Sequence, residues 1–292
     1  MRGVTLDRVQ VWGHRGSRLP GPQNTPGAVR AALAAGADGC EVDVRRSADG
    51  GLVCVHDPVV DSRAVITLMA AELAALGVPA FHEVLAAAAG GRLVIEIKNV
   101  RGEPDYSPDA LQARLVVAAL EDLIGPAHQT ERDVLISSFD PRVCDVARDA
   151  GWPVGLLAPP WADLQREAAY AIEAGYQELH AHVSAFTRTR VRRALADHLS
   201  DDIAGSAAVP LRVAAWTITT ASQALALRDA GVDAVICDDP AGVVAALAAD
   251  AARKGGQRWR ALSMPGLKAG VTSRLWQLER ARRRRAARRA RR

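Results

Sequence analysis

Short apolar runs rich in β-branched residues alternate along this chain with Ala- and Leu-rich stretches of helical periodicity. The runs predict strands at 9–13, 39–44 with 52–55, 93–97, 134–138, 153–157, 178–182, 211–217 and 232–237. The stretches predict helices near 26–35, 80–89, 108–124, 141–150, 163–174, 187–200, 220–230 and 240–252. Because parallel strands need crossover connections, and a helix is the usual one, this regular order without a block of consecutive strands predicts a parallel sheet.

Eight strand-then-helix units in about 250 residues have the size of a closed (β/α)₈ TIM barrel of the α/β class. The alternative is an open doubly wound sheet, which usually carries a Gly-rich phosphate turn after its first strand. Here the first strand ends in Gly13-His14-Arg15-Gly16, which offers side chains instead of bare backbone. We therefore favour the barrel. Only 38 residues lie between Asp57 and Glu96, which leaves room for a short capping insertion.

Polar residues gather where the predicted strands end, which is where a barrel of this kind places its reactive side chains. Glu41 and Asp43 are two residues apart in a strand, as are Glu96 and Lys98, so each pair lies on one face. Converging carboxylates raise one another's pKa unless a cation neutralises them. Their oxygen atoms favour Mg²⁺ or Ca²⁺, and no clustered His and Cys set supports zinc. For Glu96 and Lys98 alone, an internal salt bridge is the alternative.

Histidine and tryptophan side chains add further candidates, each with a structural alternative. His14 and His56 follow strands, but a core histidine or a turn before Pro58 would also explain them. His180 and His182 alternate, so one of them could face a substrate. Trp216, at the end of its strand, would form an apolar wall for a ligand or pack in the core. A last histidine, at position 82, begins a predicted helix and is expected to be structural or exposed.

Taken in order and spacing, these motifs resemble the glycerophosphodiester phosphodiesterase family over about residues 9–245. The motifs are His14-Arg15-Gly16, Asn24-Thr25, Glu41-Val42-Asp43, His56-Asp57-Pro58, Glu96-Ile97-Lys98, Ser138-Phe139-Asp140, Trp216-Thr217, Gly231-Val232-Asp233 and Asp238-Asp239-Pro240. No single motif is specific, but the ordered set is.

The resemblance implies a barrel enzyme, a phosphoric diester hydrolase that converts glycerophosphodiesters into glycerol 3-phosphate and an alcohol. In the family, the counterparts of His14 and His56 are the acid and base. The family also suggests that the glycerol hydroxyl, activated by one histidine, attacks phosphorus to form a cyclic phosphate that water then opens.

The same resemblance gives roles to the charged side chains. The counterparts of Glu41, Asp43 and Glu96 bind the metal ion, which agrees with the Mg²⁺ or Ca²⁺ site expected from the residues themselves. The counterparts of Arg15 and Lys98 face the phosphate. Two cations and a metal ion would together neutralise a phosphodiester.

The chain departs from the family pattern at Gln23, Thr219 and Cys237, where the family usually has Glu, often Asn and commonly Thr. None of these changes removes a proposed catalytic group, but they bear on the alcohol preference. The short insertion also implies an open mouth, which keeps lysophospholipase D-like or sphingomyelinase D-like hydrolysis as an alternative. A different class of alternative is a non-catalytic barrel that binds a membrane or nucleic acid.

The net charge of +4 hides an asymmetry that divides the chain. Residues 253–292 hold 15 of the 37 Lys and Arg residues and 1 of the 33 Asp and Glu residues, a net charge of +14, which leaves −10 for residues 1–252. We expect a phosphodiesterase domain at 1–252 and an Arg-rich tail at 253–292, either disordered or an amphipathic helix. Such a tail suits an anionic membrane surface, with nucleic acid as the lesser alternative.

Composition limits where the protein works. No apolar run approaches the length of a membrane span, and charges at Arg2, Asp7 and Arg8 interrupt the place of a signal peptide. We expect a cytoplasmic protein, peripheral at the membrane if the tail binds there. The four separated cysteines are expected to be reduced core residues.

Overall fold

The computed structural model describes residues 8–18, 21–186 and 211–262, with side chains described as far as residue 253. Residues 1–247 form one compact unit and residues 248–292 a second. The fold and the site described below belong to the first unit.

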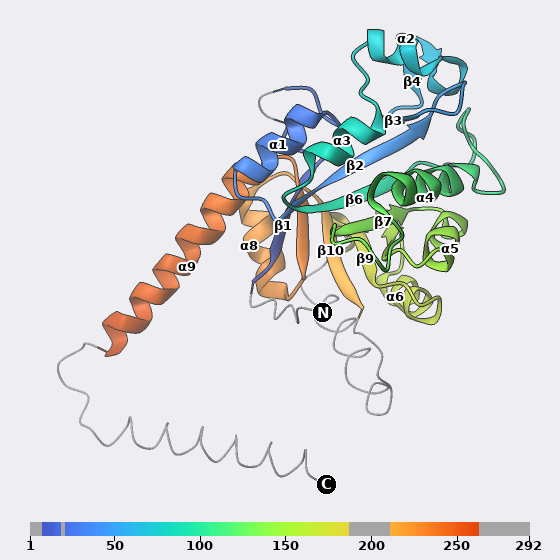
Figure 1. Cartoon of the computed structure of the whole chain (residues 1–292). Helices are drawn as coiled ribbons and strands as arrows, with labels where there is room; N and C mark the ends of the chain where they lie inside the picture. Colours follow the sequence, from blue (N-terminus) through green and yellow to red (C-terminus); the bar gives the residue numbers. More distant parts are fainter. Residues whose placement is uncertain (1–7, 19–20, 187–210, 263–292) are drawn as a thin grey trace. The chain divides into compact units, whose positions relative to one another are not determined.

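The first unit is built around a closed barrel of parallel strands (Figure 1). In ring order the strands are β1 (Gln10–His14), β2 (Gly39–Arg46), β6 (Arg92–Ile97), β7 (Val134–Ser138), β8 (Val154–Ala158), β9 (Glu178–His182), β10 (Arg212–Ile218) and β11 (Ala234–Cys237). Strand β1 pairs with both β11 and β2, which closes the ring. The predicted (β/α)₈ barrel is therefore confirmed, and the open-sheet alternative is excluded.

Helices cover the outside of the barrel (Figure 1). They are α1 (Pro26–Ala34), α3 (Phe81–Ala87), α4 (Leu111–Ile124), α5 (Pro141–Asp149), α6 (Leu164–Glu173) and α8 (Ala221–Ala230); after β11 the chain continues as α9 (Pro240–Leu262). Local chemistry starts two of them: Thr25 and Asp140 cap α1 and α5, and each cap precedes a proline at the first helical position. The predicted helix at 187–200 lies outside the described residues.

Helix α9 runs to Leu262, beyond the predicted end at residue 252. It therefore extends into the segment expected to be a tail. No helix in the part of the chain that the structure describes is long and apolar enough to cross a membrane.

The segment after β2 differs from the prediction. The 52–55 run, expected as a continuation of the second strand, forms β3 (Leu52–Cys54), which turns back and pairs antiparallel with β2. A second pair, β4 (Val59–Val60) with β5 (Arg63–Ala64), then leads through η1 (Val65–Thr67) to α2 (Ala70–Ala75).

The chain therefore contains consecutive strands without a helix between them, and the prediction that it has no block of consecutive strands was wrong. The reason is the turn at residues 47–51, where Gly50 adopts a φ of 82° that favours glycine. The β4 and α2 segments lie together beyond the end of β2 and β3 and form the short insertion that was expected (Figure 1).

The barrel interior changes character along its axis. At the amino ends of the strands, Glu178 is buried between Arg92 and Arg212. Above it lies an apolar layer made of Trp12, Val94, Leu135, Ala214, Ala234 and Ile236. His180 is fully buried against this layer, with Nε2 3.0 Å from Glu178 Oε2 and its ring tilted against Trp12. The interior is therefore a packed core, and His180 does not face the mouth.

The four cysteines, Cys40, Cys54, Cys144 and Cys237, are buried and free. Burial raises the pKa of the Cys40 and Cys144 thiols to about 12. They are core residues, as predicted.

Close approach of β1 to α1 requires glycine at position 13. A Cβ there would lie 2.6 Å from the Gly16 carbonyl oxygen and 2.9 Å from the Ala32 Cβ. We predict that Gly13→Ala lowers the free energy of unfolding by about 1–3 kcal/mol, because the backbone must shift. Gly27→Ala is the control, because its Cβ meets only Thr25 Oγ1, at 3.7 Å. Urea unfolding followed by circular dichroism measures both, and equal stability of the two variants would contradict the prediction.

Candidate active site

The sheet register brings the predicted polar residues together at the carboxyl ends of neighbouring strands. Asp43 of β2 lies opposite Glu96 of β6, and His14 of β1 lies opposite Glu41 of β2. The intervening Val42 faces the other way, into the core beneath the helices. Alternation along β2 therefore separates an outer apolar face from an inner charged one, as predicted.

Glu41, Asp43 and Glu96 form a buried cluster, which we call the carboxylate cluster. Each offers an oxygen atom, and these three atoms lie within 4.8 Å of one another. Burial, followed by the charges of Asp43 and Glu96, raises the pKa of Glu41 well above its usual value. Glu41 Oε1 is buried and has no hydrogen-bond partner among the described residues. An unpartnered oxygen in an all-oxygen donor set fits a hard divalent cation.

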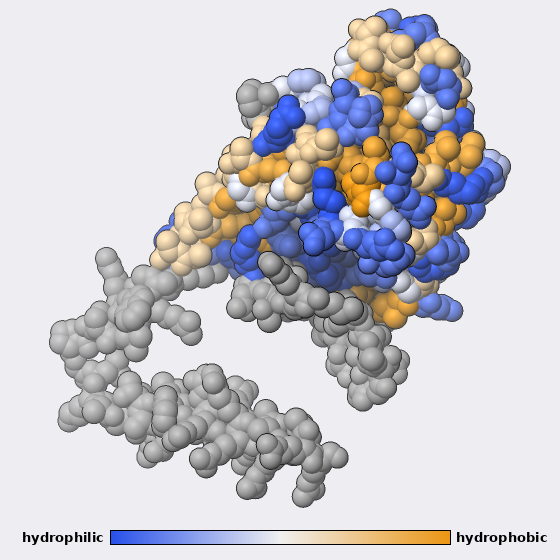
Figure 2. All heavy atoms as spheres, viewed as in Figure 1, coloured by the Kyte–Doolittle hydropathy of each residue, from blue (hydrophilic) through white to orange (hydrophobic). Residues whose placement is uncertain are grey.

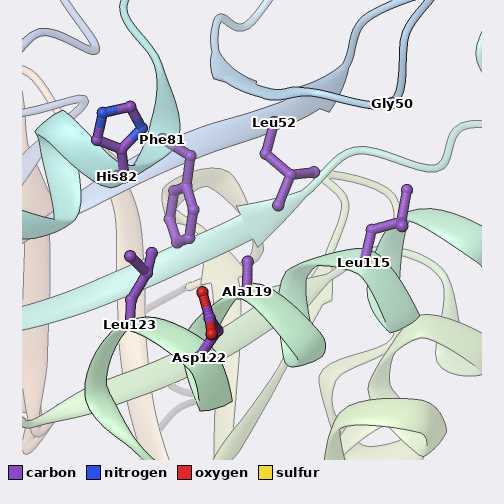
Figure 3. Close-up of a pocket in the computed structure, with 8 residues that line it drawn as sticks. All are labelled: Gly50, Leu52, Phe81, His82, Leu115, Ala119, Asp122 and Leu123. Atoms are coloured by element: carbon purple, nitrogen blue, oxygen red, sulfur yellow. The ribbon is translucent and has the colours of Figure 1, made fainter.

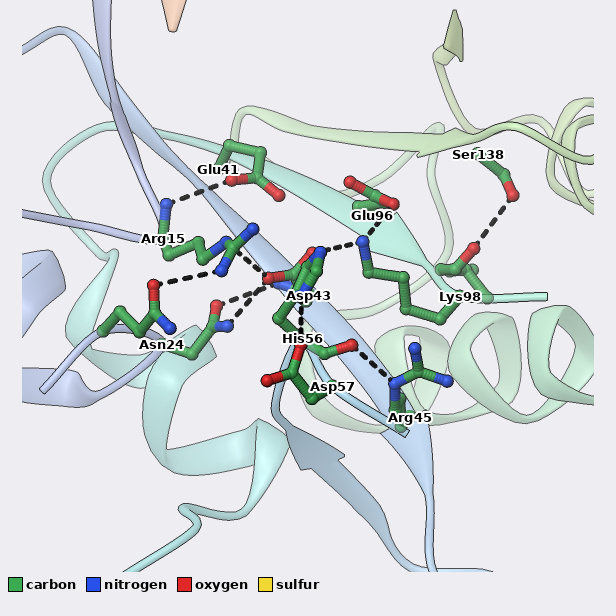
Figure 4. A network of polar contacts seen from close by, with 12 residues as sticks. Arg15, Asn24, Glu41, Asp43, Arg45, His56, Asp57, Glu96, Lys98 and Ser138 are labelled. Carbon is green, nitrogen blue, oxygen red and sulfur yellow. Dashed lines mark hydrogen bonds and ion pairs between the residues drawn. The ribbon is translucent and has the colours of Figure 1, made fainter. Parts of the chain in front are cut away.

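Two cations lie against the carboxylate cluster (Figure 4). Arg15 Nε is 3.1 Å from Asp43 Oδ2, and Lys98 Nζ is 2.8 Å from Asp43 Oδ1. Burial alone would raise the pKa of Asp43, but these cations bring it down to about 2. Lys98 also pairs with Glu96, so the salt bridge considered for that pair exists within the larger cluster. Three carboxylates and two cations leave a formal charge of −1.

Asn24 holds Asp43 in place, a role that the sequence analysis did not assign. Its Nδ2 donates to Asp43 Oδ2 at 2.8 Å, and its Oδ1 accepts from the Asp43 backbone N–H at 3.0 Å. Asn24 adopts a φ of 60°, a conformation that asparagine tolerates. Beside it, Gln23 Oε1 accepts a hydrogen bond from Arg15 Nη1. The sequence signal for this role was an asparagine, which tolerates a left-handed turn, directly before Thr25, the cap of α1.

His14 is oriented by an aspartate from the neighbouring strand. Its Nδ1 is 2.7 Å from Asp238 Oδ1, just beyond the end of β11, and Arg18 also pairs with Asp238 at 2.8 Å. Burial opposes ionisation of Asp238, but the hydrogen bonds from His14 and Arg18 lower its pKa. Because a carboxylate only accepts, the Nδ1 of His14 carries the proton, which leaves Nε2 available to a ligand.

His56 is held in the same way, by the aspartate that follows it in the sequence. Its Nδ1 is 2.7 Å from Asp57 Oδ1, and the imidazole lies beside Asp43 (Figure 4). The antiparallel β3 brings it there, because the Val55 backbone N–H donates to the Asp43 carbonyl. The sequence analysis included Asp57 and Asp238 in its motifs without a role. The sequence signal for these roles was an aspartate beside a histidine at the end of a strand. Asp57 follows His56 directly, and Asp238 follows β11, which pairs with the strand of His14.

Arg45 ties two loops to β2 and was not singled out from sequence. Its side chain is 1% exposed and donates to the His56 carbonyl at 2.8 Å and to both oxygens of Asp105 at 2.9 and 2.8 Å. A third contact joins it to Glu103 at 2.8 Å. The 101–109 segment has no helix or strand, and its Asp105 is buried. Arg45 thus anchors the backbone of His56.

Trp216 lies near the end of β10, as predicted, and its indole donates to the His180 carbonyl at 2.9 Å. Its ring meets Phe139 and His182 edge-on, with centroids 5.6 and 5.0 Å apart. Of the two alternating histidines, it is therefore His182 that lies beside a predicted site residue.

A cavity of about 320 Å³ lies apart from these residues, between α3, α4 and the start of β3 (Figure 3). His82, Phe81 and Leu123 line it, and apolar side chains come to the surface there (Figure 2). None of the charged residues described above lines this cavity. His82 is exposed on α3, as expected.

Together the fold and the site define a class of protein, a (β/α)₈ barrel with a cluster of carboxylates and cations at its mouth. Comparison with known proteins narrows the class. The model of the glycerophosphoryl diester phosphodiesterase family matches residues 14–242, and the chain belongs to this family of phosphoric diester hydrolases.

Individual relatives agree with the family. The chain is 26% identical to a glycerophosphodiester phosphodiesterase of Caldanaerobacter subterraneus subsp. tengcongensis over 85% of this chain and 100% of that protein. A putative glycerophosphoryl diester phosphodiesterase structure from Agrobacterium tumefaciens has a TM-score of 0.67 at 22% identity, covering 85% of this chain and 99% of that one. A phosphodiesterase structure from Oleispira antarctica has a TM-score of 0.65 at 24% identity, covering 82% and 97%.

We predict that Arg45→Met lowers the free energy of unfolding by about 3–5 kcal/mol, because it leaves the buried Asp105 carboxylate without its partner. The double variant Arg45→Met/Asp105→Leu should recover most of the loss, because the fully buried Asp105 charge is then absent. Chemical denaturation of the three proteins measures this. A single variant as stable as the parent, or a double variant no better than the single, would contradict the assignment.

Proposed function

We propose that the protein hydrolyses glycerophosphodiesters to glycerol 3-phosphate and an alcohol, with a divalent metal ion and with His14 and His56 as the acid and base. One observation carries the proposal: a buried cluster of net charge −1 lies between two histidines, each held by an aspartate at Nδ1. A divalent cation would make the site +1, which suits a monoanionic phosphodiester. The family membership supports the substrate class.

Glu41, Asp43 and Glu96 are the residues that would hold the metal ion, either Mg²⁺ or Ca²⁺. The unpartnered Oε1 of Glu41 and the all-oxygen donor set support this assignment. When bound, such an ion polarises a phosphoryl oxygen and stabilises the charge that develops at phosphorus.

Arg15 and Lys98 bind the phosphate in this proposal. Both lie against Asp43, so their positions are set before a substrate arrives, and a preorganised cation is more effective than one that must move. Trp216, at the carboxyl end of β10, packs against the glycerol. The Oleispira antarctica phosphodiesterase, which shares the fold, was solved in complex with the product sn-glycerol-3-phosphate, and this supports a glycerol subsite at the mouth.

The two histidines exchange protons with the substrate. One Nε2 takes the proton from the glycerol hydroxyl as that oxygen attacks phosphorus, and the other donates a proton to the departing alcohol. The aspartates at Nδ1 hold each ring in one tautomer and stabilise it when it is protonated. Water then opens the cyclic phosphate with the roles reversed.

The division of the chain remains part of this proposal. The phosphodiesterase domain would occupy 1–252 and the basic segment 253–292, whose residues 263–292 lie outside the described part. We assign that segment to an anionic membrane surface on its +14 charge, and the protein to the cytoplasm. The alternative of a non-catalytic barrel has no support in the site, since both histidines, three carboxylates and two cations are present together.

We predict that His14→Ala and His56→Ala each lower kcat by at least about 10²-fold, the usual loss when an acid or base is removed. Release of glycerol 3-phosphate from glycerophosphocholine measures this, and circular dichroism checks the fold. His82→Ala, on the exposed face of α3, is the control and should retain full activity. Near-normal turnover of either active-site variant would refute its role.

We predict that Mg²⁺ or Ca²⁺ binds more weakly as the pH falls, because the raised pKa of Glu41 means that the ion must displace a proton there. Calorimetric titration at pH 6 and pH 8 should show lower affinity at pH 6, with protons released on binding. Glu41→Gln should weaken binding at both values, whereas Glu173→Gln, exposed on α6, should not. Full activity after exhaustive treatment with EDTA would exclude a metal-dependent mechanism.

A further inference from the structure

The side chains inside the barrel lie in layers, one of which includes Glu41 of the carboxylate cluster. Because the strands of a (β/α)₈ barrel are tilted, each layer takes four side chains from alternate strands. Alternate strands of this ring are β2, β7, β9 and β11. The residues that they contribute at this level are Glu41, Ser137, His180 and Ile236, each 4% exposed or less. We call these four residues the Glu41 layer.

The strand register places Ser137 at the level of Glu41. Asp43 pairs with Glu96, and Glu96 pairs with Ser137, so two steps around the ring lead from β2 to β7. The tilt moves each partner toward the amino end of the barrel by about one residue per strand, since eight strands have a shear of about eight. Ser137 therefore lies two residues below Asp43, level with Glu41.

The same register places His180 in the layer. Ser137 pairs with Gly155, and Gly155 pairs with Glu178, two further steps around the ring. Glu178 thus lies two residues lower, and His180, two residues further along β9, returns to the level of Ser137. Ser137 faces the barrel interior, because Leu135, two residues before it, belongs to the apolar layer of that interior.

Three of the four members of the Glu41 layer carry a buried polar atom without a hydrogen-bond partner. These atoms are Glu41 Oε1, Ser137 Oγ and His180 Nδ1, and none of them bonds to another group in the part of the chain that the structure describes. An unpaired polar atom costs free energy when it is buried, and most such atoms in folded proteins have a partner. Three in one layer therefore indicate a shared partner.

The neighbouring serine shows that this lack of a partner is specific to the inner face. Ser138 faces the other way along β7. Its hydroxyl donates to the Ile97 carbonyl at 2.9 Å and accepts from the Asp140 backbone N–H at 3.2 Å. Two adjacent buried serines thus differ in one respect: the hydroxyl of Ser138 is bonded within the protein and that of Ser137 is not.

Gly155 brings the ring of His180 close to Ser137. A Cβ at position 155 would lie 2.9 Å from His180 Nε2 and 3.0 Å from His180 Cε1, so this edge of the ring fills the space beside β8. His180 Nε2 is 3.0 Å from Glu178 Oε2. Because a carboxylate only accepts, Nε2 carries the proton and Nδ1 is an acceptor.

The hydrogen-bonding capacity of the three atoms matches one water molecule. The Ser137 hydroxyl can donate to the water oxygen, and the two water hydrogens can go to His180 Nδ1 and to an ionised Glu41. Three partners are the usual number for a buried water. A hard cation would need about six oxygen ligands, whereas this layer offers two oxygens and a nitrogen and is completed by the apolar Ile236.

From this arrangement we infer that one buried water molecule joins Ser137 and His180 to Glu41, and that Ser137 is thereby a positioning residue for the metal site. The inference rests on the proposed function and deepens it. Glu41 Oε2 already accepts from the Arg15 backbone N–H at 3.0 Å. With Oε1 held by the water, both oxygens of Glu41 are fixed, and each keeps a second lone pair for a metal ion.

The test measures metal binding and stability in two matched variants. Ser137→Ala should lower the affinity for Mg²⁺ or Ca²⁺ about tenfold in calorimetric titration, the usual loss when a group that orients a metal ligand is removed. Its urea midpoint without metal should change little, because the Ser137 hydroxyl bonds to no described protein group. Ser138→Ala should do the opposite: it loses two hydrogen bonds and a lower midpoint is expected, with metal affinity unchanged.

Activity gives a second readout of the same role. With a metal concentration far below saturation, Ser137→Ala should release glycerol 3-phosphate from glycerophosphocholine about tenfold more slowly than the unchanged protein. Saturating metal should restore the rate, because the variant keeps every group proposed to contact the substrate. A rate that stays low at saturating metal would overturn the positioning role.

A crystal structure of the full chain tests the water itself. A water molecule within hydrogen-bond distance of Ser137 Oγ, His180 Nδ1 and Glu41 Oε1 would support the inference, and three atoms bonded to protein groups instead would overturn it. Equal metal affinity of Ser137→Ala and the unchanged protein would also overturn it while leaving the proposed metal site intact. Failure of the unchanged protein to bind either ion would refute the proposed metal site and, with it, the role of Ser137.

Discussion

Burying three carboxylates at one end of a closed barrel is the constraint on which the rest of the site depends. Unpaired, each charge would cost several kcal/mol in a site closed to water. For Asp43, the pairs with Lys98 and Arg15 offset that cost. Glu41 instead has a raised pKa, so its neutral form is favoured. With all three carboxylates ionised, the cluster has a formal charge of −1 and an unpartnered oxygen, and a divalent cation would stabilise it. The crowding of negative charge that raises the pKa of Glu41 would therefore also favour binding of a metal ion.

The packed interior below the cluster keeps that geometry fixed. The apolar layer around Trp12 separates the mouth from the ion pairs of Glu178 at the other end of the barrel. Buried Arg45 adds a brace at the rim, because it bonds the His56 carbonyl and Asp105 at once. The position of His56, the proposed acid or base, thus depends on an ion pair that has no part in the proposed reaction.

The strands of the barrel begin and end within two residues of the predicted bounds, because apolar β-branched runs between Ala-rich helices leave few alternatives. Alternation of side chains also predicted the shared face of Glu41 and Asp43. It did not predict that β3 runs antiparallel, because period-2 patterning is the same in both directions. The Arg45 pair with Asp105 spans 60 residues and has no local signal. Alternation puts His180 and His182 on the same face of β9, and it does not give their depth along the barrel, which is what distinguishes them.

Ring order explains how one barrel mouth can combine strong electrostatics with apolar recognition. The strands that carry or precede His14, His56 and the carboxylate cluster are neighbours, so these charged groups interact over short distances. The aromatic side chains Phe139, Trp161 and Trp216 follow or belong to the remaining strands β7, β8 and β10. In the proposed function, the phosphate lies at the charged side of the mouth, and the rest of the substrate lies toward the aromatic side. Under that proposal, changes among the aromatic residues would alter which substituent is accepted and leave the charged groups in place.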